Sequence, residues 1–305
     1  MSSERPDICV AHLVRHANDL TALREFIDSY RAHPAGAPHD LVIIFKGFRS
    51  PADVKAHEAL LAGLDWQPFF VDDTGFDIGS YLKTANRFPH MYFCFLNSFS
   101  RIEKPDWLGI LLRNLQQPGV GIVGATGSWQ SISADYRALD AAHPRHNLRF
   151  WKRWIIAVDL HFKERFTQRI FDPQIGFPDF PNPHLRTNAL LVARTTLLGL
   201  HIGGIRDKWD TFRLESGRHS LTARILRSGL RVLVVGADGL GYEPEHWPGS
   251  RTFWIHEQEN LLVSDNQTRS YSAGNEVQRQ RLAHRAWRLF PDGRSGSVFA
   301  DEWRS

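Results

Sequence analysis

Short apolar runs alternate with helix-like segments in the first half of this chain, and this alternation limits the fold more strongly than any other feature. Runs typical of buried strands occur at residues 8–14, 41–45, 67–71, 91–96 and 120–123. Between them, apolar residues recur at helical spacing over 20–30, 50–61, 78–87 and 106–115. Strands that alternate with helices build a parallel sheet with right-handed crossovers. The sequence therefore predicts an α/β fold with a mostly parallel, Rossmann-like sheet flanked by helices.

The second half of the chain is less regular. Residues 129–182 interrupt the alternation, and we expect an insertion or flap there, with a helix near 150–169. The alternation then resumes, with strands expected at 190–193 and 231–235 and helices expected at 220–227 and 275–290. We expect one main domain over residues 1–255, followed by a C-terminal lid and helix over 256–305.

Composition excludes several classes of protein. Apolar residues make up 42% of the 305 residues and charged residues 23%, so the chain is not of the disordered class. No apolar run reaches the ~18 residues of a membrane-spanning helix, and residues 1–7 lack the apolar core of a signal peptide. Cys9 and Cys94 lie in apolar runs, which is typical of buried side chains in a reduced, cytoplasmic protein.

The basic residues are mostly arginine. Thirty of the 37 are Arg, and the formal net charge is +4. The guanidinium group binds phosphate oxygens in pairs, so this bias favours a phosphorylated ligand or an anionic membrane face. A genome-wide preference for Arg codons explains the bias equally well. No run of five like charges forms a nucleic-acid-binding arm, so we expect no nucleic-acid partner.

Residues 119–124, Gly-Val-Gly-Ile-Val-Gly, match the glycine spacing of a dinucleotide-binding loop. In such a loop the glycines follow a strand and open a helix. Here Gly119 and Gly121 precede or lie within the expected strand, and no helix pattern follows directly. We therefore do not expect a nicotinamide cofactor.

Ligands of open α/β sheets bind beyond the carboxyl ends of the strands. The segments that follow the first five expected strands are polar, acidic or rich in glycine: 12–16, 46–49, 72–77, 97–101 and 124–128. Asp72, Asp73 and Asp77 suit a ligand contact, although Asp and Gly also favour tight turns. These segments define the expected binding site.

Several motifs follow one another in a characteristic order. They are an acidic segment at 72–81, Leu-Asn-Ser-Phe-Ser at 96–100, Asp-Trp-Leu at 106–108, Pro-Gly-Val-Gly-Ile-Val-Gly at 118–124, and a segment at 215–235 that opens a helix and ends in a strand. In this order they resemble the GT-A-fold glycosyltransferases of the large inverting family 2, especially members linked to rhamnan, O-antigen or capsule assembly. The resemblance covers about residues 8–245. It implies that a sugar moves from a nucleotide-diphosphate sugar to a glycan or lipid-linked acceptor.

The expected donor-binding residues follow the first four strands, with one arginine near the C-terminus: His12, Arg15, Lys46, Asp72, Asp73, Asp77, Asn97, Ser98 and Arg269. The resemblance implies this role for the acids at 72–77 and for Asn97 and Ser98. The family holds a divalent ion with an Asp-x-Asp motif, but here Phe99 and Ser100 stand where the acid would be. Because Mg²⁺ and Mn²⁺ prefer carboxylate oxygens, we assign no metal ligand, and a divalent ion is only an open option. Without an ion, cations must neutralise the leaving diphosphate, and the candidates are Arg15, Lys46, Arg101, Arg186 and Arg269.

The same resemblance implies the acceptor side. Glu215 takes the first position of the family's Glu-Asp pair, with Ser216 in the second, and is the expected general base. A first-turn Glu stabilised by the helix dipole is the competing explanation, and His219 or Asp210 could be the base instead. Acceptor contacts are expected from Trp129, Gln130, Arg186, Asn188 and His219. Trp129 would stack on a sugar face, unless it is simply packed.

Two other functions stay open at this point. A sugar-phosphate nucleotidyltransferase would need a glycine-rich loop after the first strand, and residues 12–16 contain no glycine. A non-catalytic nucleotide- or glycan-binding relative would explain the missing acids. The polar segment 264–271 is either an ordered lid over a phosphate or an exposed loop. The basic helix at 275–290 either packs on the protein or contacts an anionic membrane, which would place a cytoplasmic protein on the inner membrane face.

Overall fold

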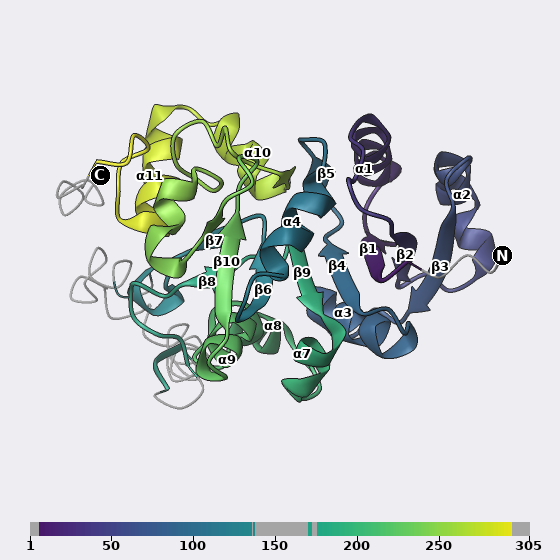
Figure 1. The fold of residues 1–305 in the computed structure, drawn as a ribbon, viewed down its shortest axis with the longest axis horizontal. Coiled ribbons are helices and arrows are strands. Elements are labelled where there is room, and N and C mark those ends of the chain that lie inside the picture. The colour runs from purple at the N-terminus through teal and green to yellow at the C-terminus, as the bar shows by residue number, and fades with distance from the viewer. Residues whose placement is uncertain (1–5, 136, 138–169, 173–175, 295–305) are drawn as a thin grey trace, which may run out of the picture.

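The computed structural model describes residues 6–135, 137, 170–172 and 176–294. Its centre is an eight-stranded sheet in the order β11-β10-β6-β9-β4-β1-β2-β3, which runs across the molecule in Figure 1. The strands are β1 (Ile8–Arg15), β2 (Asp40–Lys46), β3 (Trp66–Val71), β4 (Tyr92–Leu96), β6 (Val120–Gly124), β9 (Ala189–Ala193), β10 (Arg231–Val235) and β11 (Gly241–Tyr242). There are also two small two-stranded sheets. One pairs β5 (Arg101–Ile102) with β12 (Val263–Ser264), and the other pairs β7 (Gly127–Ser128) with β8 (His184–Leu185).

Most strands of the large sheet share one direction. Strands β1, β2, β3 and β4 are parallel, as are β6 and β10, whereas β9 runs antiparallel to both β4 and β6, and β11 antiparallel to β10. This arrangement confirms the predicted mostly parallel α/β sheet. The sequence predicts β9 as a strand but not its reversal. Because β9 is reversed, the residues just before it lie at the carboxyl ends of β4 and β6.

Helices cover both faces of the sheet. One face packs against α1 (Leu20–Ala32), α2 (Lys55–Leu61) and α4 (Trp107–Leu115), and the other against α3 (Phe76–Arg87), α7 (Arg194–Gly199) and α9 (Leu221–Arg227). Successive residues of β1 alternate between the two cores, with Val10 in the first and Ala11 in the second. Burial on both faces is the usual requirement of a parallel sheet and explains its continuous apolar runs.

Local capping explains where several helices begin. The Ser220 side chain accepts a hydrogen bond from a backbone N–H of α9 (3.2 Å), and Asn275 does the same for α11 (Glu276–Trp287; 2.9 Å). The helix expected at 50–61 divides into a 3-10 turn (Pro51–Val54) and α2. Helix α8 (Lys208–Ser216) has no counterpart among the sequence predictions.

Residues 244–294 of the C-terminal segment form regular elements that pack on the rest of the protein. They include a 3-10 helix (Pro244–Ser250), β12, α10 (Asn266–Ser272) and α11. Asp265, Thr268 and Tyr271 are at most 1% exposed, so the polar segment 264–271 is not an exposed loop. The C-terminal helical extension is thereby confirmed, while the boundary at 255, the lid role and the insertion at 129–182 stay predictions. Most of that insertion, including the helix expected at 150–169, lies outside the described residues.

Gly121 and Gly124 lie in β6, and Gly119 directly precedes this strand. A side chain at Gly121 would meet Ile225 of α9 and Leu230, and one at Gly124 would meet Leu185 and Leu190. Close packing explains Gly121 and Gly124, and a positive φ of 75° explains Gly119, without a dinucleotide loop.

Candidate functional site

Arg15 and Lys46 form a pair of cations at the carboxyl ends of β1 and β2. They are partners in the parallel register, and Asp73 follows the next strand, β3. Asp73 Oδ1 lies 4.0 Å from Arg15 Nη2 and 4.0 Å from Lys46 Nζ. The Lys46 side chain is only 1% exposed, whereas that of Asp73 is 64% exposed. The two cations therefore share a carboxylate that faces solvent.

The first turn of α3 completes this group with Phe76 and Asp77. The Lys46 ammonium lies 5.7 Å from the centre of the Phe76 ring. Burial lowers the pKa of Lys46, while the charges of Asp77 and Asp73 raise it. Burial raises the pKa of Asp77, while Arg15 and Lys46 lower it. We call Arg15, Lys46, Asp73 and Asp77 the cation cluster, in which two positive charges are paired loosely and partly away from water.

Glu215 lies in the last turn of α8, close enough to Asp77 for their charges to interact. Burial raises the pKa of Glu215; the Arg186 guanidinium and a hydrogen bond from the Thr187 backbone lower it, and Asp77 raises it. The competing explanation from sequence, a first-turn Glu, does not hold. At a helix C-terminus the dipole disfavours a carboxylate. Glu215 thus combines a raised pKa with a neighbouring arginine charge.

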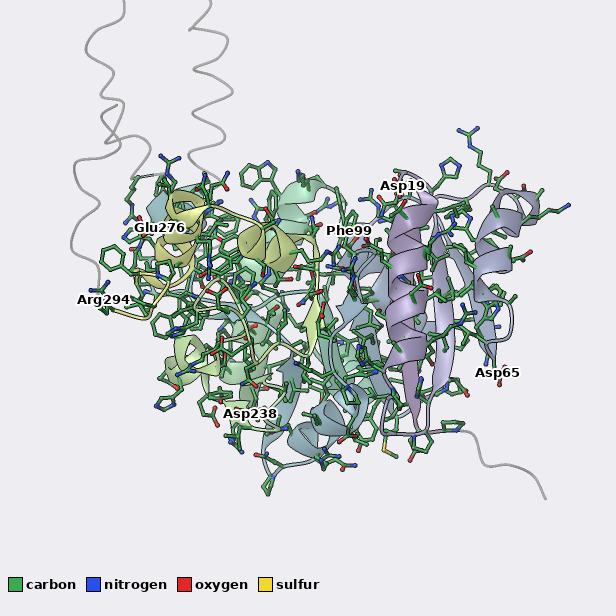
Figure 2. The ribbon with its side chains drawn as sticks, turned by 90° about the horizontal axis from the view of Figure 1, so that it is seen from above. Asp19, Asp65, Phe99, Asp238, Glu276 and Arg294 are labelled. Atoms are coloured by element: carbon green, nitrogen blue, oxygen red, sulfur yellow. The ribbon has the colours of Figure 1, made fainter. Side chains whose placement is uncertain are left out.

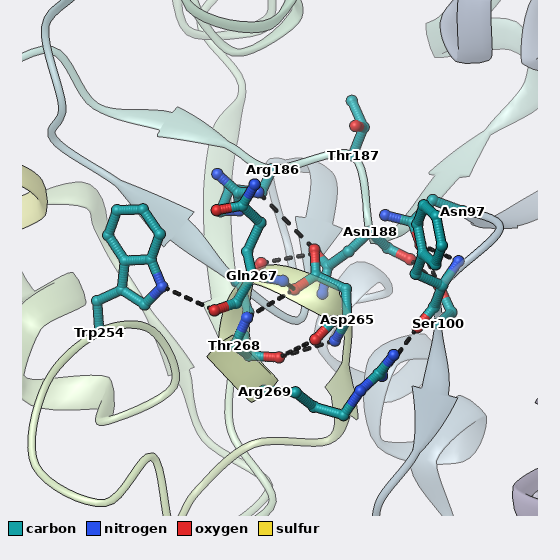
Figure 3. A network of polar contacts seen from close by, with 12 residues as sticks. Asn97, Ser100, Arg186, Thr187, Asn188, Trp254, Asp265, Gln267, Thr268 and Arg269 are labelled. Atoms are coloured by element: carbon teal, nitrogen blue, oxygen red, sulfur yellow. Dashed lines mark hydrogen bonds and ion pairs between the residues drawn. The ribbon is translucent and has the colours of Figure 1, made fainter. Parts of the chain in front are cut away.

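Asn188 ties the start of β9 to three other segments (Figure 3). Its backbone carbonyl accepts hydrogen bonds from Ser100 Oγ (2.7 Å) and the Asn97 N–H (3.2 Å). Its side-chain carbonyl accepts from Thr126 Oγ1 (2.6 Å), and its amide donates to the Val263 carbonyl (3.1 Å). Asn188 is 1% exposed. Its groups are used to hold the loops together, so an acceptor contact by this side chain is not supported.

The turn at 97–100 is the segment in which the sequence resemblance led us to look for a metal motif. Asn97 Oδ1 accepts from the Phe99 N–H (2.9 Å) and from Ser100 Oγ (3.1 Å). Ser98 is 4% exposed, and its hydroxyl has no hydrogen-bond partner among the described residues. Within the same described part of the chain, no group of three or more His, Cys, Asp or Glu could hold a metal. This donor set does not fit Mg²⁺ or Mn²⁺, and we derive no step through an ion.

Arg269 and Arg101 meet at Glu25 of α1. The Glu25 carboxylate lies 2.7 Å from Arg101 Nη2 and 3.5 Å from Arg269 Nη2. Arg269 Nη1 also donates to the Phe99 carbonyl (3.0 Å). Seen from above in Figure 2, Phe99 lies between Asp19 at the start of α1 and Glu276 at the start of α11. Arg269 thus fastens the 97–100 turn to α1 and α10.

His12 does not reach this edge of the sheet. Its fully buried ring stacks on Phe26 of α1, with 3.7 Å between ring centres and 4° between planes. Burial lowers the pKa of His12 to about 3, and neither ring nitrogen has a hydrogen-bond partner among the described residues. Alternate residues of a strand point to opposite faces, so His12 points into the α1 core while Arg15 points the other way. His12 is therefore removed from the donor-binding residues.

Trp129 and Gln130 pack near α11. The Trp129 indole N–H donates to the Pro244 carbonyl (2.8 Å), and its ring meets Trp287 edge-on at 5.6 Å. The Gln130 amide donates to Asp135 (2.9 Å). These contacts favour the packing explanation for Trp129 over sugar stacking.

The remaining predicted residues lie apart from Glu215 in their contacts. Asp72 pairs with Lys83, and this hydrogen bond lowers the pKa of Asp72. Asp210 sits in the first turn of α8 and accepts the Arg206 N–H (3.0 Å). His219 is exposed between α8 and α9. Of the three base candidates, Glu215 is the one placed beside Asp77 and Arg186.

Sequence reasoning missed Asp265. Its carboxylate is buried, and Oδ2 lies 3.7 Å from Arg186 Nη2. An Asp before a polar segment indicates a helix start, but that signal does not show that its second oxygen reaches a distant arginine.

No protein-family model and no curated protein matches the chain. Among solved structures, a mannosyltransferase from Pyrobaculum calidifontis in complex with GDP-mannose and Mn²⁺ is similar over 82% of this chain and 61% of its own, with a TM-score of 0.46 and 14% identity. A CMP-2-keto-3-deoxy-manno-octonic acid synthetase complexed with CTP is similar over 74% of this chain and 87% of its own (TM-score 0.39, 12% identity). Mouse xyloside xylosyltransferase 1 is similar over 68% of this chain and 80% of its own (TM-score 0.37, 13% identity).

The chain thus spans less than two thirds of the mannosyltransferase. At these values the likenesses assign neither a family nor an activity. The class that the structure itself defines is an α/β protein with a mostly parallel sheet and a cation cluster at its carboxyl edge.

Proposed function

We propose that this protein is a glycosyltransferase that uses a nucleotide-diphosphate sugar. The observation that carries the proposal is the state of Lys46, whose side chain is 1% exposed and whose ion pair with Asp73, at 4.0 Å, is longer than a hydrogen bond. Burial disfavours the ammonium group, and the carboxylates of Asp77 and Asp73 offset this only in part, because the pKa of Lys46 is still lowered. The diphosphate of the donor would be that anion.

Arg15 and Lys46 would neutralise the leaving group. Both extend from the carboxyl ends of adjacent parallel strands, where ligands of open α/β sheets bind. Asp73 is the exposed partner that an incoming diphosphate would displace from both cations. Two cations held in place before the reaction stabilise negative charge as it develops on the leaving oxygen.

Glu215 would be the base of a single displacement. As the acceptor hydroxyl oxygen bonds to the anomeric carbon, its proton passes to the Glu215 carboxylate. The bond from that carbon to the phosphate oxygen breaks, and the nucleoside diphosphate leaves with the electron pair. Attack opposite the leaving group inverts the anomeric centre. Placing the two reacting atoms at near-attack distance would supply much of the rate.

A glycan or lipid-linked acceptor in surface polysaccharide synthesis, on the cytoplasmic side, is part of the same proposal and is supported by the order of the sequence motifs. Among the described residues, no helix is long and apolar enough to cross a membrane. Peripheral membrane contact through α11 has weaker support, because Arg279 and Arg285 of this helix pair with Glu257 and Asp135.

Calorimetry tests the proposal on the whole chain. UDP, GDP and dTDP are titrated separately, each with Mn²⁺ and again with EDTA. We expect one of them to bind, with the same affinity in both conditions, and the matching sugar donor to be turned over. Failure of all three to bind would contradict the proposal.

The same experiment separates the alternative functions. Binding without turnover in any acceptor mixture would favour the non-catalytic relative, which the Ser at position 216 and the missing metal acids support. Release of pyrophosphate from a nucleoside triphosphate and a sugar phosphate would instead indicate a nucleotidyltransferase.

A further inference from the structure

Asp265 uses its two carboxylate oxygens for different purposes. Oδ1 accepts the backbone N–H groups of Gln267 (3.0 Å) and Thr268 (2.9 Å) and so caps α10. Oδ2 lies 3.7 Å from Nη2 of Arg186, a contact drawn in Figure 3. A neutral Ser, Thr or Asn would cap the helix as well as Asp does. The negative charge of Asp265 interacts favourably both with the N-terminus of α10 and with Arg186.

Arg186 is held from several sides. Its guanidinium lies 4.5 Å from the centre of the Phe253 ring, and its backbone N–H donates to the Thr126 carbonyl (3.1 Å). Its side chain is 16% exposed, and among the described residues its Nε has no hydrogen-bond partner. The backbone of the next residue, Thr187, helps to lower the pKa of Glu215. Arg186 thus stands between two carboxylates, one structural and one in the candidate site.

We propose that Asp265 shares the Arg186 guanidinium with Glu215, so that the C-terminal segment sets the charge around the candidate base. The role of Glu215 as base rests on the proposed function, but the charge coupling does not. Among the described residues, the charged and titratable groups that interact with Glu215 are Asp77 and Tyr81 from α3, Arg186 from the segment before β9, and Asp265 from the cap of α10.

The coupling has a definite sign. With Asp265 neutral, Arg186 has one fewer anionic partner and interacts more strongly with Glu215, and a negative charge near Glu215 is also lost. Both changes favour the ionised form of Glu215, so its pKa should fall. Removing the charge of Arg186 should have the opposite effect.

The test compares Asp265→Asn, which keeps the helix cap, with Arg186→Gln. The side-chain carboxyl of Glu215 is followed by ¹³C NMR during a pH titration, with Glu215→Gln identifying its signal. We expect the Glu215 midpoint to fall by about one pH unit in Asp265→Asn and to rise in Arg186→Gln. Asp19→Asn, which changes the exposed cap of α1, is the matched control and should leave the midpoint unchanged.

An unchanged Glu215 midpoint in Asp265→Asn would overturn the inference, whether or not any transferase activity is found. If that variant does not fold, an unchanged midpoint in Arg186→Gln overturns it instead. A wild-type protein that turns over no donor would contradict the proposed function and leave the titration result standing. If transfer is found, the acid limb of its pH–rate profile should move with the NMR midpoint.

Discussion

Arg15 and Lys46 stand opposite each other in the register of β1 and β2, and both reach the same carboxylate, Asp73, at 4.0 Å. Two buried or half-buried cations that share one solvent-facing anion form a site in which a more highly charged anion can take its place. The donor half of the proposal depends on this relationship.

Lys46→Met should weaken binding of the nucleoside diphosphate by about 10- to 100-fold, because it removes one charge-assisted contact to phosphate. Lys55→Met, at an exposed position on α2, is the matched control and should bind like the wild type. Calorimetry at constant ionic strength measures both. Equal affinity of the two variants would remove Lys46 from the donor site.

Glu215→Gln should lower turnover by about 10²- to 10⁴-fold while nucleotide affinity stays the same. It should also make the fold more stable at neutral and higher pH. The folded-state pKa of Glu215 is raised above its usual 4.5, so its stabilising contribution is full below pH 4.5 and is lost as pH rises through the folded pKa.

The gain in melting temperature of Glu215→Gln over wild type should therefore grow from pH 4.5 to pH 8. Glu58→Gln, an exposed change on α2, should show no such trend. A gain that shrinks with rising pH would be inconsistent with the placement of Glu215.

His12→Leu should leave nucleotide binding unchanged, because the ring stacks on Phe26 inside the core. The pKa of His12 is lowered to about 3, so the stability that the wild type has above pH 6.5 is lost as the pH falls toward 3. The Leu variant should escape this loss of about 1.4 kcal/mol per pH unit. Urea unfolding at pH 7 and pH 5 measures the difference, and a parallel decline in both proteins would place His12 outside the core.

Asn188→Ala should destabilise the fold by about 2–4 kcal/mol, because it leaves Thr126 Oγ1 and the buried Val263 carbonyl without this partner. Asn86→Ala on α3, where the amide bonds only within its own helix at an exposed position, should cost less than about 1 kcal/mol. Chemical unfolding compares the two. A stable Asn188→Ala protein that loses only acceptor affinity would restore Asn188 to the acceptor site.

Apolar periodicity and cap residues predict most of the elements. The strands at 41–45 and 231–235 and the helix that starts after Ser220 appear in the structure within a residue or two of their predicted bounds. These signals are local, since a strand or helix shows its buried face in its own sequence. The direction of β9 and the existence of α8 are not local properties, and neither was predicted.

For the site, the sequence alone placed Arg15 and Lys46 at strand ends and Asp77 in the segment after a strand, because the end of an apolar strand is visible in the chain itself. Only the tertiary structure shows which of these residues face one another. It also shows that His12 is buried in the core, that Asn188 hydrogen-bonds to several loops, and that Asp265 lies beside Arg186. The physical reason is that pairing between distant segments depends on how the sheet and helices pack. Which side chains face one another, which are buried and which charges interact all follow from that packing, and none of these can be inferred from a single stretch of sequence.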